Sequence, residues 1–381
     1  MLKKKRAIII RGIICLAFCF LFISCKDSQG GETRKTGKRE ESDIIKKDIT
    51  LRADLYVDSL LTTMTLEEIA GQCFMPSIYS NADSLNVLLL KKYIEDYHIG
   101  GVLLLKGDKN GVIEISKIGN STKIPLFISI DAEWGLGMRL ADAKIYPKNG
   151  NIDINSEETE LYDYGNRVAN ECREIGINMV LGPVIDIAST TGGIIGKRSF
   201  SSDPQLVADF GVAYAKGLES GGVISVAKHF PGHGGIETDS HKHTVTINKN
   251  ITMLDTVDLK PFRSYINAGL TGIMAGHIQS KALDPNGTAA SVSMDMLTSL
   301  LREELEFKGL VLTDAFNMGG ADGFSASDAL IAGADIILCP SDVGKEYNEL
   351  MKNVQMGNID VSIIKTRCKR ILFTKYLFGI I

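Results

Sequence analysis

Residues 223–243, VISVAKHFPGHGGIETDSHKH, decide the fold of this chain. The first five residues, 223–227, are apolar except for Ser225, which is typical of a strand buried on both faces. Two ionisable residues, Lys228 and His229, follow the run, and then come three glycines that favour a loop. The stretch also holds four of the six histidines of the chain, whose side chains titrate near neutral pH. It therefore predicts a buried parallel strand that ends in chemically active residues.

Seven further segments have the same apolar character, and amphipathic helical patterns lie between them. The predicted strands are Gly71–Ile78, Gly101–Leu105, Leu126–Asp131, Asn178–Asp186, Val223–His229, Gly272–His277, Leu310–Asp314 and Asp335–Cys339. Strict alternation of strands and helices indicates parallel pairing. Eight such units favour a closed barrel over an open sheet. We therefore expect an α/β protein with one catalytic domain, a (β/α)8 TIM-type barrel over residues 51–381.

Ionisable residues stand at the predicted carboxyl ends of five of these strands. They are Asp131, Asp186, Lys228 with His229, His277 and Asp314. In a parallel barrel all these ends meet at one mouth, where the chemistry of such folds is found. We expect these side chains to share one site.

Composition excludes one broad class of partner. The chain has 381 residues, of which 44% are hydrophobic and 23% charged, and its net charge is −4. These values are typical of a globular protein with a large core. Because there is no basic field, we expect no nucleic-acid partner.

The first 25 residues differ from the rest. A basic segment, residues 3–6, precedes an apolar run that is too short to favour a membrane span and ends at Ser24-Cys25. The pattern resembles a bacterial lipoprotein signal peptide, so residues 1–25 are expected to direct export and Cys25 to carry the lipid. The protein would then be anchored to a bacterial membrane on its periplasmic or cell-surface face. An uncleaved anchor or a plain signal peptide is the alternative. Polar residues 26–50 predict a flexible tether.

Four cysteines lie in the expected domain, namely Cys73, Cys172, Cys339 and Cys368. Their wide spacing predicts no zinc site, and buried free thiols are the expected state, although a disulfide stays open.

Two groups point to a hydrolytic mechanism. Asp314 directly follows an apolar strand, where burial of an unpaired carboxylate is unfavourable, so a catalytic role is expected. The alternative is that it caps the following helix. In Asp239-Ser240-His241, residues two apart can face the same way, so the carboxylate can orient the imidazole; the alternative is a surface turn. A carboxylate nucleophile with a separate proton donor is the logic of retaining glycoside hydrolysis.

Four motifs, which occur along the chain in the order typical of the family, resemble glycoside hydrolase family 3, in particular its single-barrel β-N-acetylglucosaminidases. The resemblance covers nearly all of residues 51–381. The motifs are Lys228-His-Phe-Pro-Gly-His-Gly with Asp239-Ser-His241, the run 194–204 (IIGKRSFSSDP), Ile273-Met-Ala-Gly-His277, and Thr313-Asp-Ala-Phe-Asn-Met318.

The resemblance implies that Asp314 attacks the anomeric carbon and that His241 acts as general acid and base with Asp239 as its partner. It also implies that sugar hydroxyls are held in the −1 pocket by Asp131, Arg198, Lys228 and His229. The expected substrate is terminal β-linked N-acetylglucosamine in muropeptides or related glycans. No cofactor or metal is expected, and we expect a monomer. Taken alone, Arg198 could equally form a surface ion pair, and Lys228 could extend from its strand to solvent.

The segment 131–139 departs from the family pattern Asp-x-Glu-Gly-Gly-Arg-x-x-Arg. Trp134 and Leu136 replace a glycine and an arginine. Trp134 could line the sugar site or pack on the barrel rim. The loss of the arginine leaves open how the far end of the substrate is held. Val245 stands where many relatives carry a proline.

Three other functions fit parts of the sequence. A metal-dependent hydrolase would use His229, His233, His241 and His243 with Asp239, but their spacing matches no known zinc pattern. A β-glucosidase or β-xylosidase of the same broad family would usually carry a second domain that supplies the acid. A lipid-anchored glycan-binding protein would not need both Asp314 and His241. Phosphorolysis in place of hydrolysis stays open.

Overall fold

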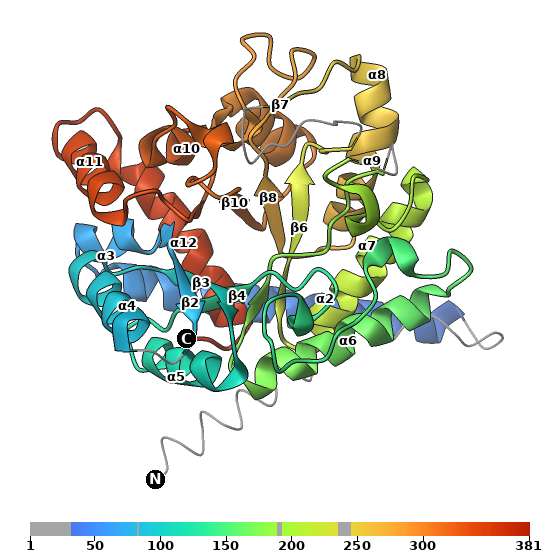
Figure 1. Cartoon of the computed structure of the whole chain (residues 1–381), viewed down its shortest axis with the longest axis horizontal. Coiled ribbons are helices and arrows are strands. Elements are labelled where there is room, and N and C mark those ends of the chain that lie inside the picture. Colours follow the sequence, from blue (N-terminus) through green and yellow to red (C-terminus); the bar gives the residue numbers. More distant parts are fainter. Residues whose placement is uncertain (1–31, 82–83, 189–192, 235–244) are drawn as a thin grey trace.

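The computed structural model describes residues 32–81, 84–188, 193–234 and 245–381. Its centre is a ring of parallel strands surrounded by helices (Figure 1). In chain order the strands are β1 (Phe74–Met75) with β2 (Ser77–Ser80), β3 (Gly101–Gly107), β4 (Phe127–Ile130), β5 (Met179–Val180), β6 (Ile224–Phe230), β8 (Gly272–Ala275), β10 (Leu310–Thr313) and β11 (Ile337–Leu338). Each of the eight predicted strand segments overlaps one of these strands, and the first segment overlaps both β1 and β2.

The first and last strands close the ring. β2 to β10 form one sheet in the order β10-β8-β6-β5-β4-β3-β2, and β1 pairs with β11. A parallel bridge from Leu312 to Ile336 joins β10 to the β11 segment. Pro76 divides β1 from β2 because it has no N–H to donate, but its carbonyl still accepts from the N–H of Leu103 at 2.9 Å. The predicted (β/α)8 barrel is confirmed.

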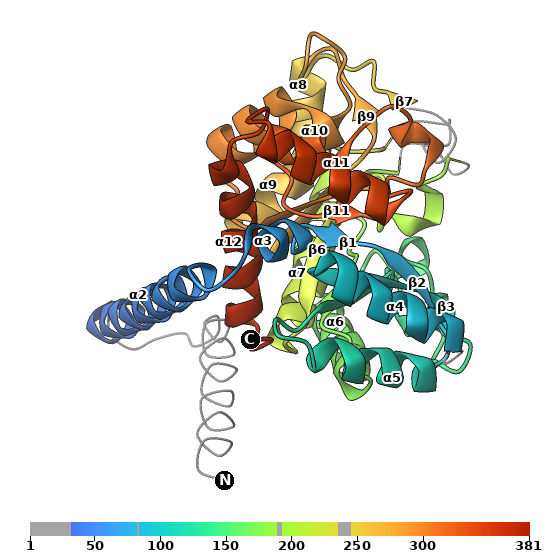
Figure 2. The same ribbon diagram turned by 90° about the vertical axis from the view of Figure 1, so that its left-hand side faces the viewer.

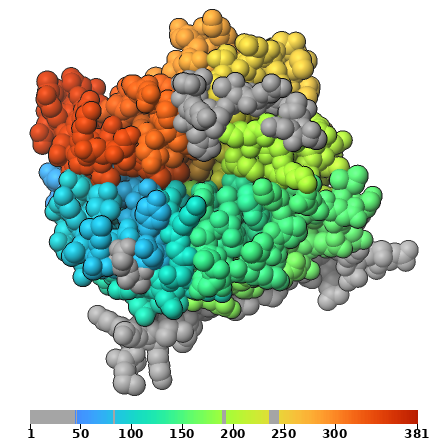
Figure 3. All heavy atoms as spheres, viewed as in Figure 1, coloured from blue at the N-terminus to red at the C-terminus, as the bar shows by residue number. Residues whose placement is uncertain are grey.

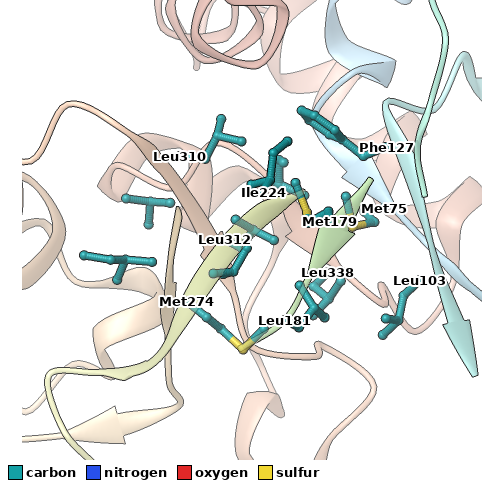
Figure 4. Close-up of a cluster of buried hydrophobic side chains, with 14 of the residues drawn as sticks. Met75, Leu103, Phe127, Met179, Leu181, Ile224, Met274, Leu310, Leu312 and Leu338 are labelled. Atoms are coloured by element: carbon teal, nitrogen blue, oxygen red, sulfur yellow. The ribbon is translucent and has the colours of Figure 1, made fainter. Parts of the chain in front are cut away.

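Side chains from every barrel strand fill the interior. The cluster drawn in Figure 4 includes Met75, Leu103, Phe127, Met179, Leu181, Ile224, Met274, Leu310, Leu312 and Leu338. All of them are at most 4% exposed. The barrel is therefore a packed core, and chemistry is confined to its ends. Cys73, Cys172, Cys339 and Cys368 are also buried and unpaired, as expected.

Helices cover the outside of the ring. They are α3 (Leu66–Gly71), α4 (Ser84–Tyr97), α5 (Lys109–Asn120), α6 (Glu158–Glu174), α7 (Pro204–Ser220), α8 (Ile251–Met253), α9 (Leu259–Asn267), α10 (Ala326–Ala332), α11 (Val343–Gln355) and α12 (Val361–Leu377), with π-helices at Leu254–Asp258 and Asp295–Glu304. Asp203 caps α7, with Pro204 in its first turn. In the space-filling view, the surface of the last third of the chain lies directly against that of the first third (Figure 3).

One helix corrects a prediction. Residues 32–50, expected to belong to a flexible tether, form the first part of α2 (Glu32–Leu61), which projects from the barrel (Figure 2). An ion pair one helical turn apart, Asp48 to Arg52 at 2.8 Å, supports this part of the helix. The later part packs on α12, where the rings of Tyr56 and Tyr376 lie 5.1 Å apart. Within the described residues, none of the helices has the length and apolar character needed to cross a membrane.

Candidate active site

The ionisable strand-end residues meet at one mouth of the barrel. Asp131 follows β4, Lys228 and His229 lie within the last half of β6, and Asp314 follows β10. The ammonium group of Lys228 lies 2.8 Å from Asp131, and His229 is near enough to Asp314 to lower the pKa of that carboxyl against the effect of burial. The shared site predicted from the strand ends is therefore present.

A chain of alternating charges crosses this mouth. Arg139 pairs with Asp131 Oδ2, and Lys228 Nζ donates to Asp131 Oδ1 at 2.8 Å. The same ammonium group lies 2.8 Å from Glu133 Oε1. Glu133 in turn binds Arg198 at two points, with Oε1–Nη2 at 2.8 Å and Oε2–Nε at 3.0 Å. We call these five residues the charge ladder.

The centre of the charge ladder is buried, and its two carboxylates are ionised. The Glu133 side chain is 1% exposed and that of Lys228 is 4% exposed. Burial alone would raise the pKa of Glu133, but Lys228 and Arg198 lower it well below its usual range. Burial would also raise the pKa of Asp131, and Lys228 and Arg139 again lower it. The carboxylates in turn raise the pKa of Lys228 and that of Arg198 against the effect of burial. The site thus holds fixed cations and anions at neutral pH.

Asp186 carries a second network behind the ladder. Its Oδ2 lies 2.7 Å from His229 Nδ1, and its Oδ1 accepts from the backbone N–H of His233 at 2.6 Å and from that of His229 at 3.1 Å. On the other side of the ring, His229 Nε2 lies 3.5 Å from Arg198 Nη2. Burial would raise the pKa of Asp186, but His229, followed by His233, lowers it overall. The imidazole of His229 is therefore fixed on both sides.

Asp314 is held with one oxygen already bound. The N–H of Ala315 donates to Asp314 Oδ1 at 2.8 Å. His277 fixes the same turn, because its Nε2 lies 3.1 Å from the carbonyl of Ala315 and its Nδ1 lies 2.8 Å from Ser291 Oγ. Burial would raise the pKa of Asp314, yet His229 and His277 lower it overall. An ionised carboxylate is a suitable nucleophile, and among the described residues the recorded hydrogen bond to Asp314 engages Oδ1 and leaves Oδ2 for the reaction.

The structure brings together Asp131, Arg198, Lys228, His229 and Asp314, five of the predicted site residues. The other three, Asp239, His241 and Cys25, lie outside the described residues. The alternatives for Arg198 and Lys228 are wrong, since both side chains are engaged inside the site.

Two residues of the site had no predicted role: Glu133 was not predicted there, and Asp186 was expected at the mouth only as one of the strand-end residues. Glu133 stands two positions after Asp131, and Asp186 ends a predicted strand, so both carried a positional signal. Neither signal identifies a partner, because the partners Arg198 and His229 come from other strands and loops.

The departures at 134 and 136 have different surroundings. Leu136 is completely buried in the main core, so its side chain packs and cannot reach a ligand. Trp134 is partly exposed, and the Lys148 ammonium group lies 5.4 Å from the centre of its ring. Trp134 therefore combines a rim position with a cation–π contact.

Within the part of the chain that the structure describes, no three histidine, cysteine, aspartate or glutamate side chains are grouped so as to hold a metal ion. His241 and His243 lie outside that part. The Nδ1 of His229 already faces a carboxylate.

Comparison with known proteins places this geometry in a family. Residues 65–374 match the family described as "Glycosyl hydrolase family 3 N terminal domain". The chain belongs to glycoside hydrolase family 3. The predicted family is thus confirmed, and the ladder, Asp186 and Asp314 all lie within the matched residues.

Similar family 3 proteins carry hexosaminidase names. A β-hexosaminidase of Nitrosomonas eutropha is 33% identical over 273 residues, which cover 68% of this chain and 78% of that protein. β-Hexosaminidase A of Pseudoalteromonas piscicida is 34% identical over 66% of this chain, but the match spans only 47% of that longer protein.

Solved family 3 structures share the fold. A β-N-acetylglucosaminidase from Paenibacillus sp. str. FPU-7 superposes with a TM-score of 0.75 at 28% identity, covering 83% of this chain and 63% of that one. The β-glucoside phosphorylase BglX superposes with a TM-score of 0.80 over 86% of this chain and 61% of that one, but at 22% identity this likeness shows the fold alone.

Proposed function

We propose that the protein is a retaining exo-β-N-acetylglucosaminidase that removes terminal β-linked N-acetylglucosamine from glycans. One observation carries the proposal: an ionised Asp314 and the charge ladder lie at the same barrel mouth, in a family 3 chain whose curated relatives include β-hexosaminidases. The site combines a nucleophile with fixed groups for sugar hydroxyls. Asp239 and His241 complete it as the acid/base pair.

The reaction has two steps. The free oxygen of Asp314 attacks the anomeric carbon, the bond to the leaving oxygen breaks, and His241 donates a proton to that oxygen. Water then attacks the glycosyl ester, His241 takes a proton from the water, and Asp314 leaves as a carboxylate. The N–H of Ala315 stabilises the carboxylate in both its free and departing states.

The charge ladder is suited to grip and orient the sugar. Asp131 is partly exposed and is held by cations on both oxygens, so it can accept from a hydroxyl without moving. Arg198 and Lys228 are in turn fixed by Glu133. Rigid donors and acceptors of this kind place the anomeric carbon before the nucleophile.

A substrate panel tests the proposal. The purified protein is offered p-nitrophenyl β-N-acetylglucosaminide, β-glucoside and β-xyloside, each with and without inorganic phosphate. We expect release from the N-acetylglucosaminide, with free sugar as product in both buffers. Preference for the glucoside or xyloside, formation of a sugar 1-phosphate, or binding without turnover would each replace the proposal by an alternative function.

Trapping the intermediate tests the role of Asp314. A 2-deoxy-2-fluoro glycoside with a good leaving group should label a single peptide, and that peptide should contain Asp314. Asp314→Ala should abolish both labelling and turnover while its thermal unfolding stays cooperative. Labelling of another carboxylate would reassign the nucleophile.

We also propose that the domain is exported and held at a bacterial membrane by a lipid on Cys25, and that it acts as a monomer. The support is the sequence of residues 3–25. Cells fed an alkyne fatty acid should label the full chain, and Cys25→Ala should remove the label and release the protein from the membrane fraction. A labelled Cys25→Ala protein would contradict the assignment. Light scattering of residues 32–381 tests the oligomeric state.

A further inference from the structure

Asp186 is a wholly buried carboxylate that lies against His229. A carboxylate can only accept hydrogen bonds. The 2.7 Å contact between Asp186 Oδ2 and His229 Nδ1 therefore requires the proton on Nδ1. In the neutral imidazole, Nε2 is then the unprotonated nitrogen and can itself accept.

The other side of the ring agrees with this tautomer. Arg198 Nη2 lies 3.5 Å from His229 Nε2, and an arginine can only donate. The His229 side chain keeps 8% of its surface exposed, whereas that of Asp186 has none. The ring therefore offers an acceptor on its site side and a donor on its buried side.

We propose that Asp186 is a positioning residue that holds His229 in the Nδ1–H tautomer, so that Nε2 accepts a hydrogen bond from a substrate hydroxyl. The proposal rests on the proposed function for the identity of the sugar. Asp186 touches no substrate and acts only through the imidazole.

The two carboxylate oxygens make an informative variant possible. Oδ1 accepts from the backbone N–H of His233 at 2.6 Å, and Oδ2 faces the ring nitrogen at 2.7 Å, while the backbone N–H of His229 lies between them, 3.1 Å from Oδ1 and 3.2 Å from Oδ2. In Asp186→Asn we expect the amide oxygen to stay with the backbone N–H of His233, because an NH2 group at that 2.6 Å contact would leave this buried donor without an acceptor. The NH2 group then faces Nδ1 and donates to it, which moves the ring proton to Nε2. Nε2 becomes a donor in place of an acceptor.

The test combines spectroscopy with kinetics. Protein labelled with 15N-histidine is compared as wild type and Asp186→Asn by long-range 1H–15N correlation, and a His229→Gln sample identifies the signal. We expect Nδ1–H in the wild type and Nε2–H in the variant. We also expect the KM for the N-acetylglucosaminide to rise about tenfold to a hundredfold, with a smaller change in kcat, since a binding interaction is lost.

Ser199→Ala is the matched control, because Ser199 Oγ donates to the backbone carbonyl of Asp186 at 2.6 Å and so supports the same segment without touching the ring. It should lower stability and leave the tautomer and KM close to wild type. An unchanged tautomer in Asp186→Asn, a reversed tautomer with unchanged KM, or an equal rise of KM in Ser199→Ala would overturn the proposal. If Asp186→Asn does not fold, the wild-type spectrum alone tests the proposal, because a proton on His229 Nε2 in the wild type would contradict it. If the wild type proves inactive on hexosaminides, the spectra still report the tautomer. Failure of the proposed function can therefore be distinguished from failure of the role proposed for Asp186.

Discussion

Arg198 and Glu133 form a two-point ion pair inside the site, with Nη2–Oε1 at 2.8 Å and Nε–Oε2 at 3.0 Å. Such a planar fork fixes the guanidinium in one orientation, which a single contact would not do. Glu133 has no surface with which to reach a sugar, as its side chain is 1% exposed. Its contribution is to hold Arg198 and Lys228 in place.

Removal of Glu133 is therefore expected to cost both stability and activity. Glu133→Ala leaves two buried cations with one carboxylate fewer, and we expect the free energy of unfolding to fall by about 3–5 kcal/mol, as for other broken buried pairs. Urea denaturation measures the loss. Asp58→Asn, which breaks an exposed contact with Lys369 on the outside of the barrel, is the control and should change stability by less than about 1 kcal/mol. Equal effects of the two variants would contradict the structural role of Glu133.

The proposed acid role of His241 predicts a dependence on the leaving group. His241→Ala should slow hydrolysis of N-acetylglucosaminides with poor leaving groups by about 10²–10⁴-fold. It should slow those with acidic phenols much less, because these need no protonation. Rates across a series of aryl glycosides give the slope, and His243→Ala, two positions away, serves as control. A loss that is uniform across the series would exclude His241 as the acid.

Lys375 predicts a stability that rises with pH. The side chain is completely buried, with its Nζ 2.8 Å from Gln72 Oε1, and burial lowers its pKa from 10.5 to about 7. Between these values the unfolded chain binds the extra proton, so this group makes unfolding harder by about 1.4 kcal/mol for each pH unit gained. The difference in unfolding free energy between wild type and Lys375→Met, taken by urea denaturation from pH 7 to 9, isolates the group. A constant difference would show that Lys375 keeps its proton in the fold.

Glu219 predicts the opposite slope at lower pH. Burial raises its pKa from 4.5 to about 7, even though Ser225 Oγ donates to it at 2.7 Å. Because the folded state holds the proton more tightly, the contribution is complete below pH 4.5 and is lost as the pH rises towards 7. Glu219→Gln keeps the acceptor oxygen but cannot ionise. As the pH rises from 4.5 towards 7, its free energy of unfolding should therefore increase relative to that of the wild type. Parallel pH profiles for the two proteins would contradict the prediction.

The strand ends of the barrel were predictable because buried parallel strands are read as apolar runs. Asp131, Lys228 and Asp314 follow such runs directly, and the rule that ends meet at one mouth then places them together. The fold and four of the five site residues were obtained in this way, whereas Arg198 was predicted only from the family resemblance.

Other features depend on contacts between distant segments. The sequence spacing of Asp186 and His229 does not reveal that a carboxylate faces Nδ1. The sequence also does not reveal that Leu136, which stands in place of the family arginine, packs in the core, because that depends on which distant side chains surround it. The helix at residues 32–50 differs from prediction because a composition rich in Lys and Glu suits both an exposed helix and a disordered segment.

The pairing of β1 with β11 joins Phe74 to Ile337, which lie roughly 260 residues apart. Until the later strand is in place, β10 and the first strand each present unpaired peptide groups that could pair with another molecule. A ribosome must therefore release almost the entire polypeptide before the cylinder can shut. Shortening the chain to stop ahead of Asp335 should yield an aggregating product even though every residue of the charge ladder would still be present.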